Sequence, residues 1–171
     1  KASIILTTYN RPELLKRSLK SALSQTFKDY EIIIVDDCSG VPAEAPKGVR
    51  LVRHKLNMGL SAARNTGIKA AKGKYVVCLD DDNELMPSFL QKTVDNIGEY
   101  DAITTGRVIQ YKNYAHNVVP RLSKFCPIDW GWLIKREVFD KIQYDEQMRA
   151  NEDTDFGIRF HKKFKATVIS D

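Results

Sequence analysis

Hydrophobic residues along this chain alternate between short continuous runs and helical spacing, and this alternation predicts the class of fold. Four mainly hydrophobic runs are typical of strands, and they lie at 2–8, 31–35, 49–53 and 75–79. Segments with helical spacing are interspersed with these runs, at 12–23, 59–71 and 87–97. Because strands that alternate with helices form parallel sheets covered on both faces, we expect a three-layer α/β domain with a mainly parallel central sheet.

The pattern is looser in the last third of the chain. The strands expected there are 102–111, which ends in a polar excursion through His116 and Asn117, 130–134 and 166–170. The helices expected there are 136–142 and 151–163. The sequence contains no internal repeat, and its 171 residues suffice for one domain with its own core.

Composition and charge restrict the partners of this domain. A net charge of +5 is compatible with anionic ligands such as phosphate esters, and with contact to an acidic membrane surface. The sequence has no Arg-rich tract, so we expect no nucleic acid partner. No hydrophobic run is long enough to span a bilayer, and Cys38, Cys78 and Cys126 form no Cys-x-x-Cys pair. We therefore expect a cytoplasmic protein, with at most peripheral contact to the cytoplasmic face of a membrane.

Polar residues follow three of the expected strands, at the points where those strands end. They are the segments 7–10, 36–37 and 80–82. Each alone has an ordinary explanation as turn chemistry. Because ligands of open α/β sheets bind outside the carboxyl ends of the strands, the three together predict a ligand site at one edge of the sheet.

The consecutive carboxylates of Asp80, Asp81 and Asp82 indicate what that site binds. Adjacent like charges repel one another, and a divalent cation offsets that repulsion, although a solvated acidic turn is the alternative. The chain has neither Gly-x-Gly-x-x-Gly after its first strand nor a Walker loop. We therefore expect phosphate to be held by Mn²⁺ or Mg²⁺ and by side chains.

These segments resemble the family 2 glycosyltransferases, which have the GT-A fold, with a mainly parallel, Rossmann-like central sheet flanked by helices. The similarity follows the family's order over nearly the whole chain. The matching segments are Thr-x-Tyr-Asn-Arg-Pro at 7–12, the Gln-Thr helix end at 23–26, Val-Asp-Asp-x-Ser at 35–39, Asn-x-Gly-x-x-x-Ala-Arg-Asn-x-Gly at 57–67, Leu-Asp-Asp-Asp at 79–82 and the Glu-Asp dyad region at 151–156.

The resemblance implies an inverting, metal-dependent enzyme that moves a sugar from a nucleotide-diphosphate donor, expected to be a UDP sugar, to a hydroxyl of a glycan or lipid-linked acceptor. It implies nucleotide and donor binding by Thr7, Tyr9, Arg11, Asp37, Arg64 and Asp81. It assigns the metal to Asp82 and the role of general base to Asp153. It assigns acceptor binding to Trp130, Gly131 and Glu152.

The same resemblance implies how the domain is divided. Residues 1–171 would form one catalytic domain, with 1–100 as the nucleotide-sugar-binding half and 101–171 as the acceptor-binding half. Many members extend well beyond the Glu-Asp dyad with a segment that can supply a third metal ligand. We therefore expect this chain to be truncated at its C-terminus.

Other interpretations stay open at this point. A nucleotidyltransferase would share the fold and the acidic metal ligands but would leave Asp153 without a task, and a non-enzymatic sugar-nucleotide-binding module is a further alternative. Trp130 and Trp132 could both be core aromatics of one strand. The basic segment 161–165 is typical of a solvated helix end, with membrane contact as the alternative. His54, His116 and His161 are isolated from one another, and each is expected to be a structural or surface histidine.

Overall fold

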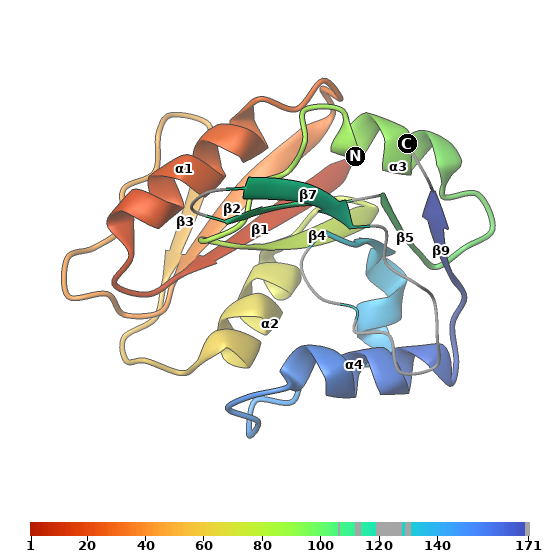
Figure 1. The fold of residues 1–171 in the computed structure, drawn as a ribbon. Helices are drawn as coiled ribbons and strands as arrows, with labels where there is room; N and C mark the ends of the chain where they lie inside the picture. Colours follow the sequence, from red (N-terminus) through yellow and green to blue (C-terminus); the bar gives the residue numbers. More distant parts are fainter. Residues whose placement is uncertain (106, 112–113, 119–127, 129–130, 170–171) are drawn as a thin grey trace.

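The protein is built around one seven-stranded sheet covered by helices on both faces (Figure 1). The computed structural model describes residues 1–105, 107–111, 114–118, 128 and 131–169. In spatial order the strands of the sheet are β3 (Arg50–Arg53), β2 (Tyr30–Asp36), β1 (Ala2–Thr8), β4 (Tyr75–Asp80), β8 (Leu133–Lys135), β5 (Ala102–Thr105) and β9 (Ala166–Ile169). Neighbouring strands are parallel except around β8, which is antiparallel to both β4 and β5.

The helices divide between the two faces of the sheet, with α1 and α3 on one face and α2 and α4 on the other (Figure 1). Their bounds are α1 (Pro12–Leu23), α2 (Leu60–Ala70), α3 (Phe89–Asn96) and α4 (Glu152–His161), and a short 3₁₀ helix, η1, covers Arg136–Asp140. Alternate residues of the central strands pack on opposite faces of the sheet, because successive side chains of a strand point to opposite sides. On β1, Ile5 packs on the α2 side, and Ile4 and Leu6 pack on the α1 side.

A cluster of aromatic side chains fixes α4 against the sheet. Phe156 of α4 is fully buried, and its ring stacks on that of Tyr144 at 4.5 Å and on that of Phe139 at 5.7 Å between centroids. Phe160, one turn later, is buried as well. The helix α4 is therefore held against the sheet by core packing of its aromatic side chains.

The sequence-based expectation of a three-layer α/β domain is confirmed, and the expected strands and helices of the first hundred residues are present. Three expectations for the last third were wrong. The expected strand 102–111 is two strands, β5 in the main sheet and β6 (Arg107–Tyr111), which pairs with a different partner. His116 and Asn117 lie in β7 (Tyr114–Val118), the antiparallel partner of β6, and not in a polar excursion.

The third wrong expectation is the helix 136–142, which is the 3₁₀ helix η1. Its five residues bury only Val138 and Phe139, too few for the hydrophobic stripe of an amphipathic α-helix. The expected strand 130–134 is limited to β8 in the described residues, and Trp130 lies outside them. Trp132 is a fully buried core residue, as the packing alternative proposed.

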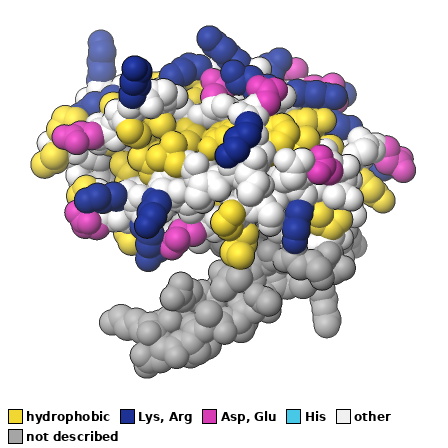
Figure 2. All heavy atoms as spheres, turned by 90° about the horizontal axis from the view of Figure 1, so that it is seen from above, with side chains coloured by type: hydrophobic (Ala, Val, Ile, Leu, Met, Phe, Trp, Pro, Cys, Tyr) yellow, Lys and Arg dark blue, Asp and Glu magenta, His cyan; other side chains and the backbone are white. Residues whose placement is uncertain are grey.

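Figure 2 looks onto the face that carries α1 and α3. On the part of that face formed by described residues, Lys and Arg side chains stand apart among acidic and hydrophobic side chains. Within the described ranges, no helix combines the length and the hydrophobicity that crossing a bilayer requires.

The close packing of α2 on β1 predicts that Gly67→Ala destabilises the fold. A Cβ atom on Gly67 would overlap with Cγ2 of Ile5. Overpacking of this kind costs about 1–3 kcal/mol, which exceeds the gain of about 0.5–1 kcal/mol that Ala offers over Gly in a helix. Urea denaturation measures the difference, with the exposed Lys69→Ala on the same helix as a control that should change stability by less than about 0.5 kcal/mol. Unchanged stability of Gly67→Ala would contradict this packing.

Candidate active site

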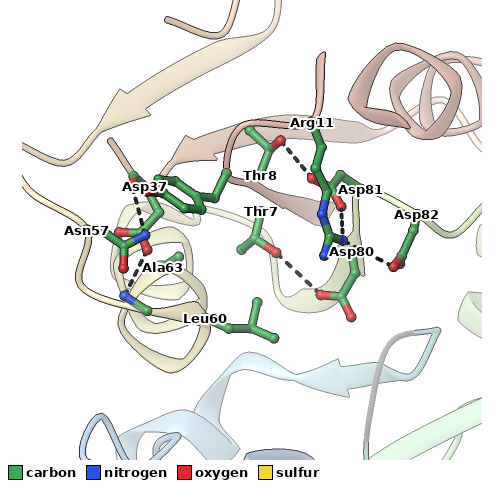
Figure 3. Close-up of a pocket in the computed structure, with 12 residues that line it drawn as sticks. Thr7, Thr8, Arg11, Asp37, Asn57, Leu60, Ala63, Asp80, Asp81 and Asp82 are labelled. Carbon is green, nitrogen blue, oxygen red and sulfur yellow. Dashed lines mark hydrogen bonds and ion pairs between the residues drawn. The ribbon is translucent and has the colours of Figure 1, made fainter. Parts of the chain in front are cut away.

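A cleft of about 470 Å³ lies at the carboxyl ends of β1, β2 and β4 (Figure 3). The parallel register brings these ends together, because Thr8 pairs with Asp36 across one side of β1 and Thr7 with Asp80 across the other. The polar segments that follow the three strands therefore converge at one edge of the sheet. The residues that line the cleft are Thr7, Thr8, Tyr9, Arg11, Asp37, Asn57, Gly59, Leu60, Ala63, Asp80, Asp81 and Asp82.

Asp37 organises one end of the cleft. Its Oδ1 accepts a hydrogen bond of 2.8 Å from the backbone N–H of Met58 and lies 2.7 Å from Nδ1 of His54. Its Oδ2 accepts a hydrogen bond of 2.8 Å from the backbone N–H of Gly59. Gly59 has a φ of +92°, a conformation that favours glycine. Asp37 thus fixes the loop that leads into α2.

The three consecutive aspartates form the opposite end of the cleft and differ in environment (Figure 3). Both carboxylate oxygens of Asp80 accept hydrogen bonds of 3.0 Å from Arg64. Asp81 is 4% exposed and accepts a hydrogen bond of 2.8 Å from the Thr8 hydroxyl. Burial raises the pKa of the Asp81 carboxyl above its ordinary value and outweighs the opposing effects of Thr8 and Arg11. The side chain of Asp82 is half exposed at the rim.

Arg11 places a positive charge between two of these carboxylates. Its Nη1 lies 3.2 Å from Oδ1 of Asp81 and 3.3 Å from Oδ2 of Asp82. The carboxylates of Asp81 and Asp82 therefore share the positive charge of the Arg11 guanidinium. Among the residues that the structure describes, no three acidic, His or Cys side chains are arranged to hold a metal by themselves. The oxygens of Asp81 and Asp82 are nevertheless the ligand type that Mn²⁺ or Mg²⁺ prefers, and such an ion would need further ligands from a diphosphate and water.

A buried guanidinium lies behind the cleft. Arg64 of α2 is 2% exposed, and its Nη1 donates a hydrogen bond of 2.9 Å to Oε1 of Glu152 while its Nη2 bonds Asp80. The guanidinium also lies over the ring of Tyr144, 5.1 Å from its centroid. Burial lowers the pKa of Arg64, but the neighbouring negative charges outweigh it and leave this pKa above its ordinary value.

Asp153 follows Glu152 in the first turn of α4. Its side chain is half-buried, and its Oδ1 accepts a hydrogen bond of 2.7 Å from the backbone N–H of Thr154. The contact between Glu152 and Arg64 ties this turn to the back of the cleft. Asp155, in contrast, forms an ion pair with Arg159 one turn later in the same helix.

The structure places the residues assigned from the sequence in four groups. Those that line the cleft are Thr7, Tyr9, Arg11, Asp37, Asp81 and Asp82. Arg64, Glu152 and Asp153 are not among the lining residues. Gly131 is buried, its N–H donates to the carbonyl of Cys78 at 3.2 Å, and its carbonyl accepts from the Thr104 hydroxyl at 2.5 Å. Trp130 lies outside the described residues.

Some residues of the cleft had no role in the sequence analysis. Asn57, Gly59, Leu60 and Ala63 belong to the matched segment 57–67, so its position in the motif was the available signal. His54 was expected to be structural, and nothing near it in the sequence indicates its contact with Asp37.

Comparison with known proteins identifies the family. The model of the glycosyl transferase family 2 matches residues 3–162. The chain is 38% identical over 92% of its length to a putative colanic acid biosynthesis glycosyl transferase, WcaA of Escherichia coli, and covers 64% of it. It is 33% identical over 94% of its length to the poly(ribitol-phosphate) beta-N-acetylglucosaminyltransferase TarP of Staphylococcus aureus, and covers 57% of it. The chain thus spans somewhat over half the length of these relatives.

Solved structures agree on the fold. All of this chain matches 58% of S. aureus TarS 1–349 in complex with UDP, with a TM-score of 0.80 and 21% identity. A second match is the mannosyltransferase PcManGT of Pyrobaculum calidifontis in complex with GDP-Man and Mn²⁺, with a TM-score of 0.73 and 18% identity over 99% of this chain and 55% of that one. These similarities show the GT-A fold. The family model matches almost the whole length of this chain. The chain therefore belongs to glycosyl transferase family 2.

Proposed function

We propose that this chain is the catalytic domain of an inverting glycosyltransferase that transfers a sugar from a UDP sugar to an acceptor hydroxyl. The observation that carries the proposal is the cleft, which presents Asp37 at one end and the pair Asp81 and Asp82 at the other. A nucleotide-diphosphate sugar needs these two chemistries, a polar group for the base and oxygen ligands for the metal on the diphosphate. The complexes of TarS with UDP and UDP-GlcNAc support this choice of donor.

The base of the donor belongs at the Asp37 end. A carboxylate has about four lone-pair positions, and three of those on Asp37 are taken by Met58, Gly59 and His54. The one left, on Oδ2, can accept the imide N–H of uracil. Tyr9 lines the same cleft and is 46% exposed, so its ring is available to stack on the base. Thr7 also lines the cleft, and its hydroxyl donates a hydrogen bond of 3.3 Å to Oδ1 of Asp80.

The diphosphate belongs at the aspartate end. Asp82 would hold Mn²⁺ or Mg²⁺ with Asp81 beside it, and the bound ion would neutralise the charge of the departing diphosphate. Arg11 is exposed enough to turn from the carboxylates towards the phosphates, because its side chain is 53% exposed. PcManGT, which shares the fold, is in complex with GDP-Man and Mn²⁺, and this supports the use of a divalent cation.

The acceptor belongs beside the first turn of α4. An acceptor hydroxyl must lose its proton as it attacks the anomeric carbon, and we assign that proton to Asp153. The N-terminal turn of a helix favours the ionised carboxylate that proton abstraction requires. A single displacement with inversion needs no protein nucleophile. We also propose that acceptor binding involves Glu152, Gly131 and Trp130. These residues belong to the proposed acceptor-binding half, 101–171, whereas residues 1–100 form the proposed donor-binding half.

The acceptor class is a hydroxyl of a glycan or lipid-linked sugar. The names of TarP, which acts on poly(ribitol-phosphate), and of WcaA, assigned to colanic acid biosynthesis, support a polymer of the cell envelope. The described cysteines, Cys38 and Cys78, are free thiols, which supports the expected cytoplasmic location. Peripheral contact with a membrane stays a prediction.

Metal dependence of donor binding tests the role of Asp82. Calorimetric titration of UDP should give an affinity at least about tenfold higher in Mn²⁺ than in EDTA. Asp82→Asn should bind UDP equally weakly in both, because an amide is a poorer ligand for a hard cation. Asp95→Asn, at an exposed position of α3 hydrogen-bonded to Gln91, is the matched control and should behave like the unmodified protein. Equal affinity of the unmodified protein in both solutions would contradict the metal site.

Asp153→Asn tests the general base. The change keeps the shape and removes the basicity, so transfer should fall by about 100-fold or more while the affinity for UDP and Mn²⁺ stays nearly constant. Asp155→Asn is the control in the same helix, and its transfer rate should fall far less. A near-normal transfer rate in Asp153→Asn would exclude this residue as the base. A loss of donor affinity equal to the loss of rate would move Asp153 to the donor site.

A further inference from the structure

His54 joins the base end of the cleft to α2 through both of its ring nitrogens. Its side chain is 8% exposed, its Nδ1 lies 2.7 Å from Oδ1 of Asp37, and its Nε2 lies 2.9 Å from Oγ1 of Thr66. His54 follows β3 directly, whereas Asp37 follows β2 and Thr66 lies in the middle of α2. Three separate elements thus meet at one imidazole ring beside the cleft.

The hydrogen-bonding capacities fix the direction of the first contact. An ionised carboxylate accepts hydrogen bonds and donates none, so Nδ1 of His54 must carry the proton that it shares with Asp37. The Thr66 hydroxyl can donate to Nε2 of a neutral ring, so both ring nitrogens are satisfied in this tautomer. The imidazole is therefore held in one orientation by a partner on each side.

The contact with His54 determines where the remaining acceptor position of Asp37 lies. His54 and the N–H of Met58 together occupy Oδ1, and the N–H of Gly59 takes one position on Oδ2. One acceptor position remains, and it lies on Oδ2. If His54 released Oδ1, one acceptor position would be free on each oxygen, because the N–H groups of Met58 and Gly59 would still occupy one position apiece.

We propose that His54 is a positioning residue for the donor base, which directs the single free acceptor position of Asp37 into the cleft. This inference rests on the proposed function, because it assumes that Asp37 receives the imide N–H of uracil. A base edge with a different order of donors and acceptors, such as that of guanine, gains less from one fixed acceptor. His54 therefore contributes to the preference for UDP over GDP, without contact to the base.

Two substitutions of nearly equal polarity separate this role from a structural one. The amide of Asn reaches the place of Nδ1, so His54→Asn keeps a donor for Asp37 and loses the contact with Thr66. The amide of Gln reaches the place of Nε2, so His54→Gln keeps a partner for Thr66 and loses the donor for Asp37. Asp37→Asn serves as the reference for loss of the acceptor, and melting temperatures are recorded for every variant.

Calorimetric titration with UDP and with GDP in Mn²⁺ gives the readout. We expect His54→Gln to weaken UDP binding about tenfold and to reduce the ratio of UDP to GDP affinity, and His54→Asn to retain UDP affinity within about threefold. In the Asp37→Asn background, His54→Gln should cause no further loss, because the two changes remove the same interaction.

The outcomes distinguish this inference from the proposed function. If Asp37→Asn weakens UDP binding but the two His54 variants lose equal affinity for UDP and GDP in step with their melting temperatures, His54 is structural and the inference is overturned. If the unmodified protein does not bind UDP, or if Asp37→Asn binds it normally, the proposed base site fails and the inference fails with it.

Discussion

The buried guanidinium of Arg64 is the contact on which the arrangement of the site depends. It joins Asp80, at the end of β4, to Glu152, at the start of α4, and it is almost fully excluded from water. Removing one partner of such a buried network leaves an uncompensated charge, which costs about 3–5 kcal/mol. The cleft and the helix turn that carries Asp153 are therefore held in one geometry by the same side chain.

Position, and not residue type, gives the acidic residues of the cleft different roles. Asp80 accepts hydrogen bonds from Arg64, and Asp81 is buried against Thr8. Asp82 lies at the rim of the cleft with half its side chain exposed. Asp37 resembles none of these, because backbone N–H groups and His54 take most of its acceptor positions. The ligand chemistry available to each carboxylate follows from what its neighbours have already taken.

Much of this arrangement could be predicted from the sequence, because its signals are local. The hydrophobic runs gave the central strands, and the polar residues that follow them converge since parallel strands end at the same edge. The contacts that order the site are not local. Glu152 lies 88 residues from Arg64, and His54 lies 17 residues from Asp37 and 12 from Thr66. No periodicity or spacing in the sequence indicates such pairs. For this reason the sequence analysis assigned Arg64 to donor binding and gave His54 no role in ligand binding.

The most direct test of the account is a crystal structure with UDP and Mn²⁺, in which anomalous scattering locates the metal. We expect one Mn²⁺ at about 2.0–2.3 Å from a carboxylate oxygen of Asp82, bridged to the diphosphate, with the Arg11 guanidinium displaced from between the carboxylates of Asp81 and Asp82. We also expect the uracil against Tyr9, with its imide N–H on Oδ2 of Asp37. A metal bound away from Asp82, or a base bound outside the Asp37 end of the cleft, would contradict the account.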